Sequence, residues 1–238
     1  MINSAIIRKE LSKYRENEII FASSLYKEKL YKQNVSESSF YKLLERMYKA
    51  KQLEKISKGI YYFPKKGKYG FVPISNEEII SFFTNNKEGM VVGYNLYNKL
   101  NLTTQISKNY IVYSSKAKNE IKRIRNVEIR NINMKYSEEY IRIIELLEVL
   151  QNFHKIQDIN FKIFYKYVKS FANTYDEKKV NIVLEKIKYK KSTISFLSEV
   201  LNHFEVENNL DSYLSKLSKY NHMHMEDIYK LAQSQERF

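Results

Sequence analysis

Lys and Arg side chains are the residues of this chain whose spacing points most clearly to a chemical role. Residues 36–70 contain nine basic and three acidic side chains, and residues 105–135 contain eight and two. Residues 71–104, between these clusters, contain only two basic and three acidic side chains. Clustered cations attract polyanions such as the nucleic-acid backbone. The sequence therefore predicts two separate surfaces that favour an anionic partner.

The charge is also unevenly divided along the whole chain. Residues 1–135 contain 26 basic and 12 acidic residues and so carry the entire formal net charge of +14, whereas residues 136–238 contain 15 of each. This asymmetry indicates a polyanion-binding module in the first half, joined to a part with a different role.

A helix is predicted to present the first basic cluster. Ser36 is suited to cap its N-terminus, because a serine hydroxyl accepts a hydrogen bond from an amide of the first turn. Phe40, Leu43, Leu44 and Met47 follow with helical spacing and should form one buried stripe. The polar side chains of this segment then lie on the opposite face, where a ligand can reach them.

The elements around this helix predict a winged helix. Two short helices are expected before it, at Asn3–Tyr14 and Glu18–Tyr31, and a β-hairpin after it, from the apolar-rich runs Leu53–Ser57 and Ile60–Phe63. Gly59 stands between these runs and can take the positive φ that tight turns often need. In proteins with this layout, the third helix enters the major groove of DNA.

On this interpretation the third helix and the hairpin divide the DNA contacts between them. Side chains near the start of the helix reach base edges, and flanking cations meet phosphates. The expected base contacts are Ser38, Ser39, Tyr41 and Lys42; the expected phosphate contacts are Arg46, Lys49 and Lys51, with Lys58, Lys65, Lys66 and Lys68 on the wing. The alternative is an ordinary solvated surface or a face that binds protein, and Glu45 on the same side favours it.

The second basic cluster lies on or beside predicted strands at Asn109–Ser114, Glu120–Ile124 and Val127–Asn133. It consists of Lys116, Lys118, Lys122, Arg123, Arg125 and Arg130. These side chains could extend a nucleic-acid surface or dock an acidic protein. They could also protect a sheet edge, because lysines on edge strands oppose aggregation. The sequence does not decide between these roles.

The overall prediction is an α+β fold that is mainly helical. Residues 1–70 form the winged helix-turn-helix domain, and residues 71–135 form a mixed α/β region with a small sheet and helices at Ser75–Thr84 and Val91–Leu100. Residues 136–238 show helical periodicity with short connections, which indicates a helical bundle that serves as an interaction region.

Catalytic and cofactor signatures are lacking. The chain has no Cys, and therefore no disulfide or zinc thiolate site, and it has no P-loop, GxGxxG, GxSxG or HExxH motif. His222 and His224 lack a nearby third ligand in the sequence. We therefore expect no enzymatic activity, no metal and no cofactor. The first 15 residues are basic and have no apolar core, and no stretch is long enough to span a membrane, so a cytoplasmic location is expected.

Two segments resemble a known family. The run LEKISKGIYYFP at Leu53–Pro64 resembles the wing of AbiEi-type antitoxins from type IV toxin–antitoxin systems. The run GYNLYNKLNLTTQ at Gly93–Gln105, followed by a strand at Tyr110–Ser114, is similar to the segment that follows the winged helix in that group. The resemblance covers roughly Glu18 to Asn152.

This resemblance implies a transcriptional repressor whose winged helix binds double-stranded DNA at the promoter of its own operon. It further implies that the C-terminal part counteracts a nucleotidyltransferase-like toxin, and it assigns no catalytic residue. The alternative function is a winged-helix module that binds an acidic protein partner without regulating DNA.

Overall fold

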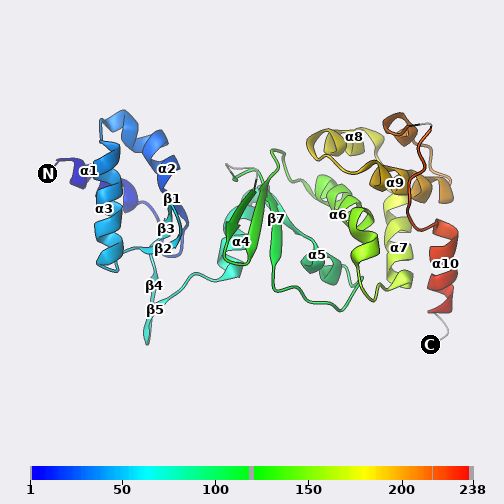
Figure 1. Ribbon diagram of the computed structural model, residues 1–238, viewed down its shortest axis with the longest axis horizontal. Coiled ribbons are helices and arrows are strands. Elements are labelled where there is room, and N and C mark those ends of the chain that lie inside the picture. Colours follow the sequence, from blue (N-terminus) through cyan, green and yellow to red (C-terminus); the bar gives the residue numbers. More distant parts are fainter. Residues whose placement is uncertain (1, 118–120, 216, 236–238) are drawn as a thin grey trace. The chain divides into compact units, whose positions relative to one another are not determined.

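The computed structural model describes residues 2–117, 121–215 and 217–235. Over these residues the fold is α+β and mainly helical, which confirms the predicted class (Figure 1). The chain forms two compact units. The N-terminal unit comprises residues 1–82 and 123–127, and the C-terminal unit comprises residues 83–122 and 128–238. The predicted middle region is thus shared between the two units.

Three helical segments form the helical part of the winged helix in the N-terminal unit. They are α1 (Ile2–Leu11), α2 (Ala22–Leu25), which continues into a π-helical turn (Tyr26–Leu30) and a 3-10 turn (Tyr31–Gln33), and α3 (Glu37–Lys49). The predicted second helix is wrong at its start, because residues 20 and 21 form strand β1 (Ile20–Phe21). They pair there with a later strand, and this tertiary pairing overrides the local helical pattern.

A three-stranded antiparallel sheet completes the winged helix. Strands β2 (Glu54–Ser57) and β3 (Ile60–Tyr62) form the predicted hairpin, and β3 also pairs with β1, which gives the order β1-β3-β2. Gly59 in the turn has φ of +74° and so needs the freedom of glycine. The helices and this sheet together have the predicted winged-helix arrangement (Figure 1).

Helix α3 is fixed by its apolar stripe. Phe40, Leu43, Leu44 and Met47 are all buried, as the helical period predicts, in a core that also holds residues of α1 and β1. The predicted cap is present, because the Ser36 hydroxyl accepts a hydrogen bond of 3.3 Å from the Ser39 amide. The opposite side of α3 is thereby held toward solvent.

A second hairpin follows directly. The Pro- and Gly-containing stretch after β3, whose lysines were predicted to lie on the wing, forms β4 (Lys65–Gly67) and β5 (Gly70–Val72). Lys65 pairs with Val72, and Gly67 pairs with Gly70. In Figure 1 this hairpin extends away from α3 and from the three-stranded sheet of the same unit.

A four-stranded sheet follows helix α4 (Asn76–Thr84), and its order is β6-β7-β9-β8. The three later strands match the predictions: β7 (Tyr110–Ser114), β8 (Ile121–Ile124) and β9 (Val127–Asn131). The predicted helix at Val91–Leu100 is wrong in its first part. There the chain forms β6 (Gly89–Val92), turns at Gly93 with φ of +73°, and only then forms α5 (Tyr94–Lys99).

The rest of the C-terminal unit is the predicted helical bundle. Its helices are α6 (Glu138–Asn152), α7 (Phe161–Ala172), α8 (Glu177–Lys186), α9 (Lys191–His203) and α10 (Met225–Ser234). Phe153, Phe164 and Phe196 pack ring against ring in the core, and α10 lies against α7. No helix of the described residues is both long and apolar enough to cross a membrane.

The carboxylate of Glu148 lies inside the core of the C-terminal unit. Glu148 of α6 is buried and accepts a hydrogen bond of 2.7 Å from the Tyr113 hydroxyl of β7. Burial raises the pKa of Glu148, although the bond from Tyr113 and the charge of Arg130 oppose this rise. A carboxyl group with a raised pKa binds more protons in the folded chain than in the unfolded chain. Its contribution to the free energy of unfolding therefore falls as the pH increases through that range.

We predict that Glu148→Gln removes this pH dependence while it keeps an acceptor for Tyr113. The free energy of unfolding of the variant, relative to the wild type, should increase as the pH rises from about 4.5, the ordinary pKa, and level off above the raised pKa. Urea unfolding at a series of pH values measures the difference. Glu138→Gln, at an exposed position on the same helix, is the control. Wild-type and Glu148→Gln curves that stay parallel would contradict the prediction.

Candidate nucleic-acid interface

The solvent side of α3 carries the predicted contacts. Ser38, Lys42, Arg46 and Lys49 are exposed along it. The Glu45 carboxylate lies 3.2 Å from Lys49 Nζ, and both side chains are well exposed. This pair has no net charge, so Lys42 and Arg46 supply the positive charge on the face of the helix.

Two of the four side chains expected near bases are less accessible. Ser39 is half-buried, and its hydroxyl oxygen accepts a hydrogen bond of 2.7 Å from the Ser36 hydroxyl. Tyr41 is also half-buried with its ring 5.2 Å from that of Phe40, and burial raises the pKa of its phenol. Ser38 and Lys42 are therefore the more available pair near the start of α3.

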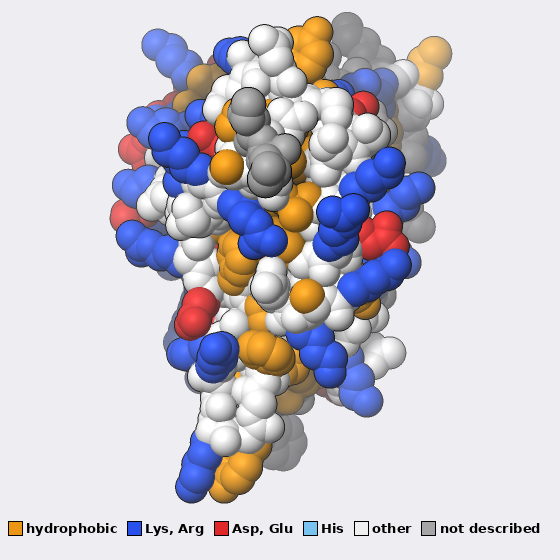
Figure 2. All heavy atoms as spheres, turned by 90° about the vertical axis from the view of Figure 1, so that its left-hand side faces the viewer, with side chains coloured by type: hydrophobic (Ala, Val, Ile, Leu, Met, Phe, Trp, Pro, Cys, Tyr) orange, Lys and Arg blue, Asp and Glu red, His pale blue; other side chains and the backbone are white. Residues whose placement is uncertain are grey.

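Helix α1 lies beside α3 and contributes Asn3, Ser4 and Ile7 to a shared groove. This groove has a volume of about 410 Å³ and includes Lys42 and Arg46 in its lining. Arg8 and Lys9 of α1 are exposed, although the sequence analysis did not assign them to the interface. Their position on the first helix of the predicted winged helix is the sequence feature that could have pointed to them. Figure 2 shows Lys and Arg side chains spread over this end of the molecule, with few Asp or Glu among them.

The predicted wing lysines are divided between two hairpins. Lys58 is exposed at the β2–β3 turn, where the Gly59 carbonyl accepts a hydrogen bond of 2.9 Å from the Ala22 amide, so this turn lies against the start of α2. Lys51, just after α3, is exposed as well. The remaining wing lysines are exposed on the second hairpin, Lys65 and Lys66 on β4 and Lys68 in the connection to β5.

Part of the second basic cluster is engaged with acidic neighbours. Lys116 Nζ lies 2.6 Å from a Glu88 carboxylate oxygen. Arg130 forms an ion pair of 2.8 Å with Glu128, and its guanidinium carbon lies 5.9 Å from the centre of the Tyr113 ring. These contacts hold Lys116 and Arg130 to their own unit and reduce the charge available to a ligand.

The other members of the cluster are placed differently. Arg125 donates a hydrogen bond to the Ile74 carbonyl within the N-terminal unit. Arg123, of the same unit, is exposed, whereas Lys122 is half-buried and burial lowers its pKa. Lys118 lies outside the described residues. The cluster is therefore divided between the two units.

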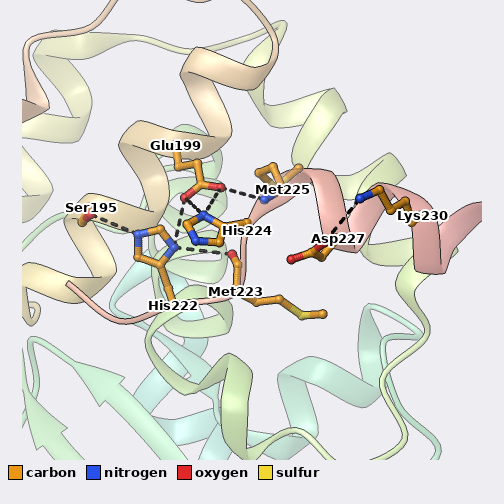
Figure 3. Close-up of polar contacts among 8 residues, drawn as sticks. All are labelled: Ser195, Glu199, His222, Met223, His224, Met225, Asp227 and Lys230. Atoms are coloured by element: carbon orange, nitrogen blue, oxygen red, sulfur yellow. Dashed lines mark hydrogen bonds and ion pairs between the residues drawn. The ribbon is translucent and has the colours of Figure 1, made fainter. Parts of the chain in front are cut away.

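A polar cluster that the sequence analysis did not find joins α9 to the start of α10 (Figure 3). Nδ1 of His222 and Nδ1 of His224 each lie 3.2 Å from a Glu199 carboxylate oxygen. The Met225 amide, at the N-terminus of α10, donates a hydrogen bond of 2.7 Å to the same carboxylate. Glu199 is more than 20 residues from the histidines in sequence, so no local spacing reveals the cluster.

This cluster also contains a serine. Ser195 Oγ lies 3.0 Å from Nε2 of His222, so serine, histidine and glutamate follow one another as in a hydrolase relay (Figure 3). However, Ser195 lies within α9, where backbone amides bond to helix carbonyls and cannot stabilise an oxyanion. In the described part of the chain, no three His, Cys, Asp or Glu side chains are grouped to hold a metal. The contacts therefore fit a clamp that holds α10 to α9.

These features define a winged helix with an exposed basic side on α3, together with a second, helical unit. The chain belongs to DUF6088, a family of unknown function whose model matches residues 7–191. No curated protein matches the chain in sequence. Among solved structures, the RV2827C protein from Mycobacterium tuberculosis is similar, with a TM-score of 0.40 and 11% sequence identity. That similarity covers 86% of this chain and 76% of the other.

We predict that Glu199→Ala lowers the free energy of unfolding of the C-terminal unit by about 1–2 kcal/mol, because the variant loses the acceptor for two imidazoles and for the N-terminus of α10. Urea unfolding measures the loss, and proteolysis should become faster near residue 224. Glu185→Ala, at an exposed position of α8, should change the stability by less than about 0.5 kcal/mol. Equal effects of the two substitutions would refute the clamp.

Proposed function

We propose that this protein is an antitoxin-like transcriptional regulator that binds double-stranded DNA at its own promoter and represses its own operon. The observation that carries the proposal is the exposed side of α3, where Ser38, Lys42 and Arg46 stand opposite a fully buried apolar stripe. An α-helix fits the major groove of B-DNA, which is about 12 Å wide. On this proposal Ser38 and Lys42 reach base edges while Arg46 meets phosphate.

Long-range electrostatics support the same partner. All of the net charge of +14 comes from residues 1–135, which include the whole winged helix. Each phosphate that a Lys or Arg neutralises releases counterions, so binding through this face should weaken steeply as the salt concentration rises. The neutral second half does not contribute to this attraction.

The antitoxin role is supported by the resemblance of Leu53–Pro64 and Gly93–Gln105 to AbiEi-type antitoxins. On this proposal the C-terminal unit counteracts a nucleotidyltransferase-like toxin and the protein itself is not an enzyme. The region matched by the DUF6088 model, residues 7–191, includes the winged helix and most of the helical bundle. This extent is in keeping with a function that uses both parts.

A second candidate function is the binding of an acidic protein partner without regulation of DNA. Half-burial of Ser39 and Tyr41 favours it, because the start of α3 then offers fewer groups to read bases. Both functions predict sensitivity to salt, and only DNA regulation predicts preference for one sequence. A titration of the protein against its own upstream DNA, with a scrambled duplex as competitor, separates them. Equal affinity for the two duplexes would contradict the regulator and favour the protein-binding module.

We predict that Lys42→Ala and Arg46→Ala each weaken binding to the upstream DNA by about 1–3 kcal/mol, because each removes a contact in or beside the major groove. Fluorescence anisotropy at fixed salt measures the change. Lys178→Ala removes the same charge from an exposed site in the C-terminal unit and should leave the affinity nearly unchanged. Similar losses in all three variants would show that only the total charge matters.

We also predict that removing Lys65, Lys66 and Lys68 together lowers the salt slope of binding by up to about 3, if each neutralises one phosphate. The measurement is log affinity against log salt concentration for the wild type and the triple alanine variant. A variant that lacks Lys166, Lys178 and Lys186, all exposed in the C-terminal unit, keeps the wild-type slope. An unchanged slope in the first variant would remove these lysines from the interface.

A further inference from the structure

We propose that the β4–β5 hairpin enters the minor groove of DNA beside the major-groove site of α3. One sugar-phosphate strand of the DNA would lie in the concave protein surface between α3 and the hairpin. Tyr69 at the hairpin tip would then meet the base edges. This inference rests on the proposed function, and it assigns a role in specificity to a segment whose lysines alone were expected to make backbone contacts.

The hairpin is exposed on all sides. Tyr69 at its tip is 94% exposed, and Phe71 and Val72 are each 44% exposed. A two-stranded hairpin by itself is marginally stable in water. Aromatic residues in such a position are suited to contact with a partner. Lys68 Nζ lies 5.4 Å from the centre of the Tyr69 ring, so the tip presents a cation and an aromatic ring together.

Charge restricts the kind of partner. Residues 55–76 contain five lysines and no Asp or Glu. Lys65, Lys66 and Lys68 are exposed on the hairpin itself. A surface with this composition is complementary to a polyanion. Because the hairpin belongs to the same unit as α3, a duplex bound by α3 is the polyanion that these observations favour.

The hairpin is also narrow immediately behind its tip. Gly67 pairs with Gly70 immediately behind the tip, so this pair has no side chains to widen the ribbon. A Cβ atom at Gly67 would lie only 2.8 Å from Val72 Cγ2, and Gly70 has φ of +123°. Gly70 therefore requires glycine, and a side chain at Gly67 would have to displace that of Val72. The minor groove is about 6 Å wide, so a tip that enters it must be thin.

A concave surface separates the hairpin from α3. It has a volume of about 540 Å³, and its lining includes Lys51 and Gln52 after α3, Lys66 and Phe71 on the hairpin, and Tyr14 and Glu16 after α1. Lys51 and Lys66 thus place cations on its two sides. Glu16 supplies the single carboxylate of this lining. The backbone of Glu16 also forms a β-bridge with that of Phe63.

The geometry of B-DNA explains why these features belong together. A single sugar-phosphate strand separates a major groove from the adjacent minor groove, so a protein that occupies both must straddle that strand. The concave surface between α3 and the hairpin can accept the strand, with Lys51 and Lys66 toward its phosphates. Tyr69 then points to the minor-groove floor. There the exocyclic N2 amino group of guanine would obstruct a ring.

Inosine provides a direct test. An inosine·cytosine pair has the major-groove pattern of G·C but lacks the N2 amino group in the minor groove. With the full-length protein and its preferred duplex, hydroxyl-radical footprinting first locates the protected flank. The base pairs of that flank are then replaced by either I·C or G·C. We expect the wild type to bind the I·C duplex about tenfold more tightly, comparable to the effect of one unfavourable base pair. Tyr69→Ala should bind both duplexes equally and more weakly than the wild type binds I·C.

Two sets of variants complete the test. Tyr31→Ala removes another exposed tyrosine, 68% exposed, from a turn of the same unit and should retain the tenfold ratio. Lys51→Ala and Lys66→Ala should each lower the salt slope by about 1 if they meet the enclosed strand. Circular dichroism of each variant shows that the fold is retained, as these exposed positions predict.

The possible results separate this inference from the function on which it rests. Equal wild-type affinity for the I·C and G·C duplexes would overturn the minor-groove assignment. So would a weaker Tyr69→Ala variant that keeps the tenfold ratio, because the tyrosine would then contact only the backbone. In both cases the regulator stands if Lys42→Ala still weakens binding to the preferred duplex. A wild-type protein without preference for any duplex would overturn both proposals together.

Discussion

Burial of the apolar stripe of α3 is the constraint on which the N-terminal unit depends. Phe40 and Leu44 are completely buried, so the rotation of the helix about its axis is fixed and Lys42 and Arg46 are held on the other side. The Ser36 cap fixes where the helix begins. Positive charge by itself attracts any polyanion, whereas charge on a helix with a fixed orientation can meet one groove in one register.

The C-terminal unit has its own core and a different chemical character. Its aromatic and aliphatic side chains form a cluster distinct from that of the winged helix, and several of its carboxylates are bonded within the unit. Glu148 is bonded to Tyr113, Lys116 to Glu88, and Glu199 to the start of α10. These carboxylates therefore serve the internal structure of the unit, whereas Lys42 and Arg46 of the winged helix face solvent.

The sequence predicted what depends on local periodicity and composition. The class of fold, the stripe of α3, the β2–β3 hairpin and the bundle helices α6 to α9 all follow from spacing within a short window, whereas α10 was not predicted. Strands β1 and β6 did not, because Ile20 and Val91 lie in segments with helical character that become strands only through distant partners. Glu199 could not be linked to His222 for the same reason. The basic side chains of the candidate interface could be listed from the sequence, but not their division between two hairpins or the ion pairs at Lys116 and Arg130.

The packing of α10 against α7 has a consequence for the order in which the protein is made. Met225 and Ile228 complete a core whose other members begin near residue 90, so the C-terminal unit cannot close until the ribosome has synthesised α10. The N-terminal unit needs no residue beyond 127. Since domains generally fold as they emerge during synthesis, the winged helix is complete while the bundle is still being translated, and the nascent chain can approach a polyanion before its second unit exists.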